Sequence, residues 1–322
     1  MNVSSRTATS ASLGIVAAFA AIYVIWGTTY LAIAISIQTM PPFITGALRF
    51  LVAGALMYAW LRTRTPRPFA TVNLRSAAVV GVLLAGIGNG FVIWAQQGIP
   101  SGIAALIVTS MPVTVLILDW AFFSRRAPSR QGLVGTAVAL AGVVTIIMHT
   151  HAIAGTAQPI HLISMILAVL AWALGTLWQK RAARSDNVLN FTAAQVLFGG
   201  VFQLAMSFVD GEWSRFDVAA VSVSSWLAVA YLVVFGSIIG LNCYLWLLTR
   251  VPAPKVTTYA LVNPVVALIL GSLILNEEIT VLTIVATVLV LFGVALVLFQ
   301  DWKIDSLWRG RRSLRTAERT SC

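Results

Sequence analysis

Charge is the scarcest property of this 322-residue sequence, because Asp, Glu, Lys and Arg together make up only 10% of it. A soluble domain carries charge on about a quarter of its residues, so most of this chain cannot face water. Cysteine is also rare: Cys243 lies inside an apolar run and Cys322 is the last residue, which excludes a disulfide framework. The sequence has no Gly-rich phosphate-binding loop ending in Lys, which disfavours ATP-driven transport by this chain alone.

Long apolar runs are abundant, since 59% of the residues are hydrophobic. A helix needs about 20 such residues to cross about 30 Å of hydrocarbon. The runs lack the period-two alternation of outer-membrane strands, and backbone groups in lipid must pair within their own segment. We therefore predict an all-α integral membrane protein with a retained first helix, not a cleaved signal peptide. The ten predicted transmembrane helices are residues 13–36, 41–61, 76–97, 101–123, 131–149, 160–179, 188–209, 226–249, 255–276 and 280–299.

The basic residues are distributed unevenly, although the net charge of +11 first suggests a nucleic-acid-binding protein. Of 21 Lys and Arg residues, 19 fall in segments on one side of the spans, while Arg215 lies on the other side and Arg49 lies within a span. Positive charge of this kind marks cytoplasmic loops, so we expect both termini to be cytoplasmic. The spans leave no room for a nucleic-acid-binding domain, and the basic cytoplasmic tail, 300–322, makes membrane lipid an expected partner.

An internal repeat divides the chain into two units of five spans each, about 13–149 and 160–299. Because five is odd, the first span of one unit runs in the opposite direction to the first span of the other. Inverted repeats are a hallmark of secondary transporters, whose substrate site lies near the midplane between the repeats. The matched residues are Trp94, Pro100 and Pro112 with Trp246, Pro252 and Pro264 at an offset of 152, and Trp26 and Arg49 with Trp172 and Gln195 at an offset of 146.

Several motifs resemble those of one transporter family. "VIWGTTYLAI", "ITGALRFLVAGALM", "GNGFVIWAQQGIPSGIAALIVTSMP", "FGSIIGLNCYLWLL" and "TTYALVNPVVALILGSLILNEEIT" are similar to segments of the EamA-type transporters of the drug/metabolite transporter superfamily, and most similar to their YedA-like bacterial branch. The resemblance covers nearly all of residues 13–299. It implies a ten-helix fold of two repeats in a bacterial plasma (inner) membrane and the export of a small metabolite, without naming that metabolite.

The sequence departs from the family pattern at one acidic position. Members of the family often have an acidic residue at the ends of spans four and nine. Glu277 matches this position in the second repeat, but Arg125 takes the equivalent position in the first. A symmetric role for the acid is therefore not expected.

Arg49 lies eight residues into the second span, about 12 Å from its outer end at 1.5 Å per residue. A charge at that depth normally faces the interior of the helix bundle or a water-filled cavity. Asp119 is predicted about 15 Å deeper, near the inner interface, so we expect no direct ion pair between the two. Arg49 either binds a substrate carboxylate or phosphate, or clamps helices together through their carbonyl groups.

Other side chains within the spans are candidates for contact with a small-molecule substrate. Amides and aromatic rings there either line a pocket or fill helix contacts. Pro112 and Pro264 are predicted to form paired hinges, freeing the carbonyl groups of Val108 and Ala260. The substrate-binding candidates are Trp26, Tyr30, Arg49, Asn89, Trp94, Trp172, Gln195, Asn242, Trp246, Tyr259 and Asn263.

Coupling and cofactors are less clearly indicated. Asp119 and Glu277 are the candidates for proton coupling, and facilitated diffusion is the alternative. His149, His151 and His161 flank one connection, but no Cys or carboxylate accompanies them there, so we expect no metal and no cofactor. A proton partner and a homodimer both stay open.

The function expected is that of a secondary transporter that exports an amino-acid-like or drug-like metabolite by alternating access, and not that of an enzyme. The alternative is an integral-membrane enzyme that acts on a lipid-linked substrate. Such an enzyme should place acids, histidines or a metal near one membrane face, and no catalytic residue set with suitable spacing is found. A channel would more often line a symmetric pore from several chains.

Overall fold

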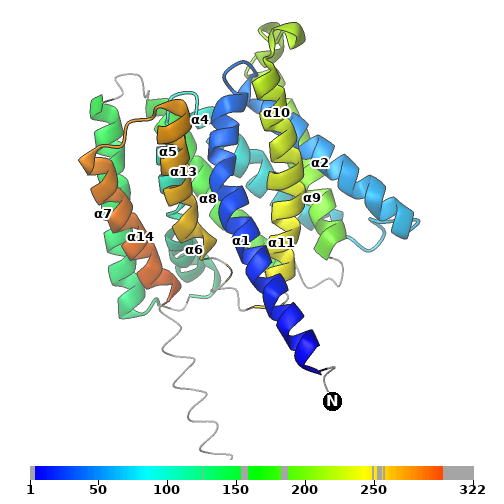
Figure 1. Ribbon diagram of the computed structural model, residues 1–322, viewed down its shortest axis with the longest axis horizontal. Helices are drawn as coiled ribbons and strands as arrows, with labels where there is room; N and C mark the ends of the chain where they lie inside the picture. The colour runs from blue at the N-terminus through cyan, green and yellow to red at the C-terminus, as the bar shows by residue number, and fades with distance from the viewer. Residues whose placement is uncertain are drawn as a thin grey trace, which may run out of the picture.

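The computed structural model describes residues 4–125, 127–153, 159–182, 188–248, 250–251, 256 and 258–299. Every element within these ranges is helical (Figure 1). Nine helical spans in the described residues are long and apolar enough to cross a membrane, and a further apolar helix has 17 residues. The prediction of an all-α membrane protein with about ten transmembrane helices is confirmed.

The first five spans differ in their regularity. The first, second and fifth are single helices, whereas the third and fourth are composites that contain π-helical turns. Such turns are rare and are concentrated at functional sites. The elements are α1 (Ser4–Ser36), α2 (Pro42–Arg64), α3 (Leu74–Gly81), η1 (Val82–Asn89), α4 (Gly90–Ala95), α5 (Ser101–Val108), α6 (Met111–Leu118), η2 (Asp119–Phe123) and α7 (Arg130–Ile153).

The second five spans repeat this order except in the ninth, which is a single helix with no π-helical turn. The eighth span contains a π-helical segment at the position that the third span has in the first half, and each segment ends before a glycine, Gly240 or Gly90. The elements are α8 (Pro159–Ala182), α9 (Val188–Val209), the short η3 (Glu212–Ser214) and η4 (Val218–Ala220), α10 (Val223–Tyr231), η5 (Leu232–Ile239), α11 (Gly240–Leu248), α13 (Tyr259–Leu275) and α14 (Val281–Leu298).

Helix starts follow from local sequence. Asn73, Ser222 and Thr280 each accept a hydrogen bond from a backbone N–H in the first turn of the helix that follows, which satisfies a donor that has no partner inside that helix. The helices α2 and α5 begin instead directly after Pro41 and Pro100, whose side chains offer no such acceptor.

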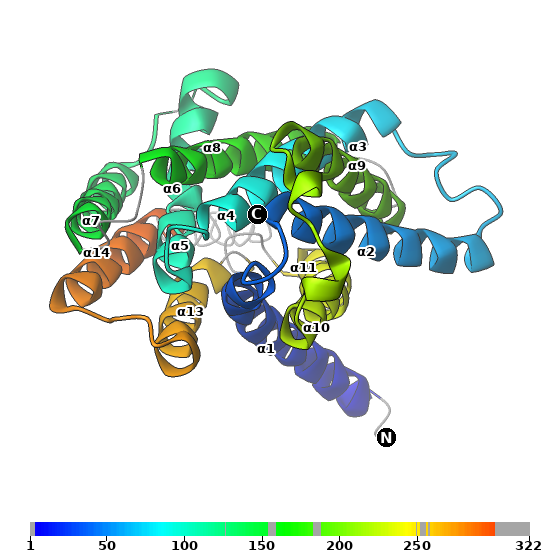
Figure 2. The same ribbon diagram turned by 90° about the horizontal axis from the view of Figure 1, so that it is seen from above.

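Helix contacts between the two halves are related as a two-fold axis requires, so each contact has a counterpart in which the halves are swapped. The equivalent helices α2 and α9 pack together, as do α7 and α14. Helix α1 packs against the eighth and ninth spans, and its counterpart α8 packs against the third and fourth. Figure 2 shows α1 and α8 on opposite sides of the centre.

The connections between spans alternate between two ends of the molecule. Thr39, after α1, hydrogen-bonds to Ser225 at the start of α10, and Trp94, near the end of α4, stacks on His161 at the start of α8 with ring centroids 5.0 Å apart. Helix α1 therefore ends at the end of the molecule where α8 begins, which is the inverted arrangement.

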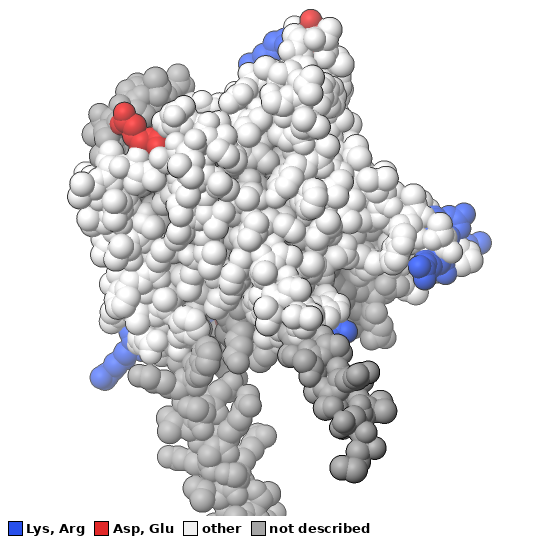
Figure 3. All heavy atoms as spheres, in the orientation of Figure 1, with Lys and Arg blue, Asp and Glu red and all other residues white. Residues whose placement is uncertain are grey.

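Charge distinguishes the two ends, which we call the acidic end and the basic end. The described connections at the acidic end, residues 37–41, 96–100, 210–222 and 276–280, hold five acids and only Arg215 as a base. The described connections at the basic end, 65–73, 124–125 with 127–129, and 250–251, hold Arg67, Arg125 and Arg250 and no acid. Figure 3 shows the visible acidic atoms in two separate places in the upper part of the molecule.

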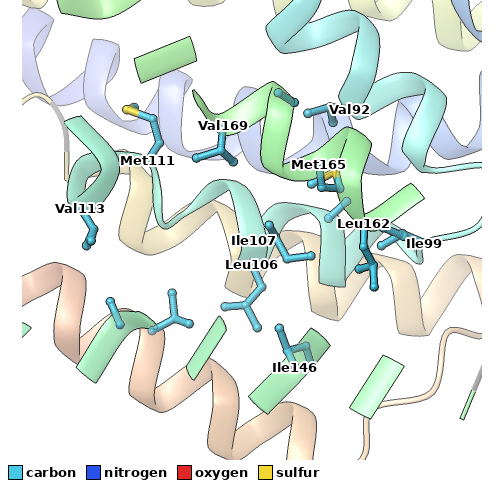
Figure 4. Packing of buried hydrophobic residues seen from close by; sticks show 14 of the residues in the cluster. Val92, Ile99, Leu106, Ile107, Met111, Val113, Ile146, Leu162, Met165 and Val169 are labelled. Atoms are coloured by element: carbon cyan, nitrogen blue, oxygen red, sulfur yellow. The ribbon is translucent and has the colours of Figure 1, made fainter. Parts of the chain in front are cut away.

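The largest buried apolar cluster joins the two halves. It brings together residues of α4, α5, α6, α7, α8 and α14, among them Leu106, Met165 and Val290, none of which is exposed. Figure 4 shows Leu106 and Ile107 of α5 between α8 and the pair α7 and α14. Close van der Waals packing of this kind holds helices together in a membrane, where lipid is as apolar as the core.

The segments predicted as paired hinges differ from each other. The fourth span is interrupted at Thr109 and Ser110, directly before the helix that contains Pro112. The ninth span continues through Pro264 without interruption. The two prolines therefore share a sequence position but have different local structures.

Glycines allow α7 and α14 to approach closely. A Cβ atom added to Gly293 would lie 2.4 Å from the backbone N of Ala139 and 2.6 Å from the carbonyl O of Gly135. Both contacts are with backbone, which cannot move aside as a flexible side chain can. Gly293 is thus required by the distance between these helices.

We expect Gly293→Val to lower the free energy of unfolding by about 1–3 kcal/mol, because it overpacks this contact. Thermal unfolding in detergent micelles measures the change. Val288→Leu, on the same helix at a side chain that is 61% exposed, is the control and should leave stability unchanged. Equal melting temperatures for the two variants would contradict the packing described here.

Candidate functional site

A cavity of about 500 Å³ lies between the two halves. Its lining is mostly apolar and comes from both halves. None of the described connections at the acidic end contributes to it, whereas Asp119, Gln179 and Leu298, near the basic end, do. Of the predicted substrate-binding residues, the lining includes Trp26, Tyr30, Arg49, Asn89, Trp172, Gln195, Tyr259 and Asn263.

Arg49 is the buried cation of this cavity, with 6% of its surface exposed. Its Nε donates a hydrogen bond to Ser237 Oγ at 2.9 Å, and its Nη1 lies 3.5 Å from Asn89 Oδ1. Ser237 belongs to η5 and Asn89 to η1, so one guanidinium contacts the equivalent π-helical segments of both halves. Its carbon also lies 4.8 Å from the ring centroid of Phe50, an additional cation–π contact.

No carboxylate lies within ion-pair distance of Arg49 in the described part of the chain, where the ion pair found is between Arg215 and Asp210. Asp119 lines the cavity, and no ion pair between it and Arg49 is found in the described residues. A guanidinium offers five N–H donors, and the two contacts above use only part of that capacity. Arg49 is therefore able to receive an anionic group.

An aromatic wall stands on one side of the cavity. The ring centroid of Trp26 lies 4.7 Å from that of Tyr259 and 5.3 Å from that of Tyr244, and the two tyrosines are 5.9 Å apart. The indole N–H of Trp26 donates to the carbonyl of Gly236 at 3.2 Å, which fixes the ring. Such a wall offers apolar contact area with little loss of side-chain entropy.

Two amides present oxygen atoms that have no hydrogen-bond partner among the described residues. These are Gln195 Oε1 and Asn263 Oδ1, both buried and both on residues that line the cavity. Leaving a buried polar atom unpaired costs about 1–3 kcal/mol. A ligand with a hydrogen-bond donor would remove that cost.

Three predicted substrate contacts are not among the lining residues. Trp94 stacks on His161 toward the acidic end. Asn242 donates to the carbonyl of Ile238 in its own span at 2.7 Å. Trp246 lies under the guanidinium of Arg250, 4.1 Å from the ring centroid.

Some of the predicted hinge and coupling residues line the cavity and others do not. Pro112 and Asp119 line the cavity, whereas Pro264 and Glu277 do not. Val108 and Ala260, whose carbonyl groups the prolines were expected to free, are both lining residues. Glu277 instead accepts backbone hydrogen bonds at the acidic end.

Two residues of the site were missed by sequence reasoning. Ser237 is part of the segment "FGSIIG", and a serine carries no signal that an arginine far away in sequence will contact it. Tyr244 was detectable, because it is an aromatic residue within a span, two positions after Asn242.

The described residues contain no group of three or more His, Cys, Asp or Glu side chains suited to a metal ion. The side chains of His149 and His151 lie outside the described set, as does the tail 300–322.

Comparison with known proteins places the chain in a family. The model of the EamA-like transporter family matches residues 12–148 and again 159–299. The chain belongs to the EamA-like transporter family. It is 34% identical over 278 residues to the uncharacterized inner membrane transporter YedA of Escherichia coli K12, an alignment that covers 86% of this chain and 88% of that protein.

Other family relatives are more distant. Protein PagO of Salmonella typhimurium is 28% identical over 85% of this chain and 89% of its own. A probable amino-acid metabolite efflux pump of E. coli K12 is 25% identical over 86% of this chain and 92% of its own. A solved crystal structure has the same fold, with a TM-score of 0.62, 19% identity and coverage of 91% of this chain and 99% of that one. EamA membership and these names indicate a multi-pass membrane transporter and not an enzyme.

The two contacts of Arg49 should differ in their contribution to stability. We expect Ser237→Ala to lower the free energy of unfolding by about 1–3 kcal/mol, because it removes a buried partner of a charged donor. Asn89→Ala should cost less, since its contact is 3.5 Å long. Thermal unfolding of the two purified variants measures the difference, and a larger loss for Asn89→Ala would contradict the geometry.

Proposed function

We propose that the protein is a secondary transporter that exports a small organic metabolite carrying a carboxylate across the bacterial inner membrane by alternating access. The observation that carries this proposal is Arg49, a buried guanidinium that lines the cavity between the repeats without a carboxylate partner in the described residues. A substrate carboxylate would supply the missing charge. Arginine is suited to this because its fork of N–H groups matches a carboxylate in two parallel hydrogen bonds.

The rest of the cavity fits an amino-acid-like or drug-like solute. The oxygens of Gln195 and Asn263 would accept hydrogen bonds from an ammonium or another donor, and the wall of Trp26, Tyr244 and Tyr259 would contact an apolar side group. The relative named as a probable amino-acid metabolite efflux pump supports the same class and the outward direction. The enzyme alternative has no supporting observation in the described residues.

Transport would proceed by exchange between two packings of the repeats. In the arrangement seen here the cavity reaches the basic end, which the excess of Lys and Arg in the sequence assigns to the cytoplasm. A solute would enter from that side, bind Arg49, and leave when the acidic end opens. Asp119, which lines the cavity near the basic end, is the candidate for proton coupling, and facilitated diffusion is the alternative.

Arg49→Ala should lower transport by about 100-fold or more, because two charge-assisted hydrogen bonds to the solute are lost. Flux is measured in proteoliposomes against a panel of carboxylate-bearing metabolites, with and without a pH gradient. Arg49→Lys should retain partial activity, since Lys keeps the charge but not the fork.

The matched control is Arg215→Ala, which removes the exposed ion pair with Asp210 at the acidic end and should leave flux unchanged. Wild-type flux in a correctly inserted Arg49→Ala variant would mean that Arg49 is a structural clamp only.

The orientation makes a second prediction. In a background with Cys243→Ser and Cys322→Ser, a membrane-impermeant maleimide should label Asp217→Cys from outside intact cells and Arg67→Cys only from the cytoplasmic side. Both positions are exposed. Labelling of both from one side would refute the inverted arrangement, and a reversal of the two sides would refute cytoplasmic termini.

A further inference from the structure

Two glutamates at the acidic end share a local structure that the cavity does not explain. Gly211, two residues after α9 ends at Val209, lies in the left-handed region with φ 66°, and the next residue is Glu212. Helix α13 is followed by Asn276, also left-handed with φ 56°, and the next residue is Glu277. In each case a left-handed residue reverses the chain after the helix and brings a glutamate into the connection.

Each carboxylate accepts hydrogen bonds from two consecutive backbone N–H groups in the other half of the protein. Glu212 accepts from Phe43 at 2.9 Å and from Ile44 at 2.8 Å, at the start of α2. Glu277 accepts from Ser101 at 2.7 Å and Gly102 at 3.0 Å, at the start of α5. Both glutamates belong to the second repeat, and both helices that donate these hydrogen bonds belong to the first.

The helix starts that receive these carboxylates lack a cap of their own. Both follow a proline, Pro41 or Pro100, that makes no side-chain capping bond. A carboxylate at a helix N-terminus also interacts favourably with the helix dipole. Each glutamate therefore supplies between repeats what a Ser, Thr or Asp normally supplies within a helix.

Neighbouring residues enclose the carboxylate of Glu212 and leave space for that of Glu277. Glu212 has no exposed surface, and its burial raises the pKa of its carboxyl group, with the hydrogen bonds from Phe43 and Ile44 opposing that rise. At the other site, a Cβ atom added to Gly271 would lie 2.4 Å from Glu277 Oε2. Gly271 thus leaves the space that lets the Glu277 carboxylate lie over α13 and reach α5.

The first repeat has the same reversal without the acid. Arg125, two residues after the fourth span ends at Phe123, lies in the left-handed region with φ 53°, and Asn276 does so directly after the ninth span. The residue that follows Arg125 in the sequence, Arg126, is also basic, so the sequence supplies no acid at this reversal. A basic residue cannot accept hydrogen bonds from a helix N-terminus.

We propose that Glu212 and Glu277 are two latches that hold the acidic end closed, and that both must release their helix starts for the cavity to open there. The proposal rests on the proposed function only in assuming that this end opens during a transport cycle. Opening by separation of the repeats breaks four charge-assisted hydrogen bonds and exposes four backbone donors. Among the described residues, no carboxylate at the basic end makes comparable hydrogen bonds to a helix start. The lining of the cavity extends at that end to the last turns of its helices.

The test measures access to the cavity from the acidic end. In a background with Cys243→Ser and Cys322→Ser, Ile33→Cys places a thiol at a cavity-lining position that is 3% exposed. A charged, membrane-impermeant maleimide is added to the preparation, intact cells or inside-out vesicles, in which it labels the exposed Asp217→Cys. The labelling rate at position 33 then reports opening of this end without any substrate.

Glu277→Gln and Gly271→Ala should each raise this rate about tenfold, which is the ratio that one lost charge-assisted hydrogen bond produces. Gln removes the charge and one acceptor. Gly271→Ala keeps the charge of Glu277 but displaces its carboxylate, and Ala stabilises a helix better than Gly does. If both variants raise the labelling rate, neither the lost charge nor a weakened helix can be the common cause. Glu212→Gln should act in the same direction.

Glu278→Gln is the matched control, because Glu278 is the exposed neighbouring acid, and its rate should equal that of the parent. Unchanged labelling in both Glu277→Gln and Gly271→Ala, or an equal rise in Glu278→Gln, would overturn the latch proposal. Since no solute is used, faster labelling in a protein that moves none of the metabolite panel would support the latches while refuting the proposed transport.

Discussion

The contact of one guanidinium with both repeats is the interaction on which the centre of this protein depends. Burial of a cation in a membrane protein is costly unless the cation is paired and hydrogen-bonded. Arg49 meets this requirement in part, with hydrogen bonds to a hydroxyl from η5 and an amide from η1 and with the ring of Phe50, but it has no carboxylate within ion-pair distance among the described residues. The guanidinium of Arg49 thereby connects the two π-helical segments. The aromatic wall and the unpaired amide oxygens line the same cavity.

The repeats are largely symmetric in their backbone, apart from the fourth and ninth spans, and asymmetric in their chemistry. Helix pairing, the π-helical segments and the left-handed residues after spans four and nine follow the two-fold relation. Side chains do not: Gln195 takes the position equivalent to Arg49, and basic residues stand where Glu277 has its counterpart. In the proposed cycle, the shared backbone allows two packings, and the differing side chains determine the chemistry of the cavity and the stability of each end.

Sequence reasoning recovered the fold because hydrophobic length, charge placement and the parity of the spans are properties of whole segments. The spans predicted at 13–36 and 101–123 match the helical spans Leu13–Ser36 and Ser101–Phe123. Arg49 was identifiable because a charge in an apolar run is conspicuous. Ser237 and the helix-capping role of Glu277 were not, because each depends on a contact between residues far apart in sequence. Trp94, Asn242 and Trp246 have the residue types of a binding site, but the direction in which each side chain points depends on helix rotation, which composition does not reveal.

The left-handed turns at Gly211 and Asn276 have a consequence for the population of states. If the carboxylates that follow them favour the packing seen here, the packing open at the acidic end is a minority conformer in the absence of solute. A ligand that approaches a minority conformer binds with an apparent affinity reduced by the fraction of molecules that present it. Solute already released at that side would then be recaptured poorly, so the protein would resist back-flow even without a difference in intrinsic affinity between its two states.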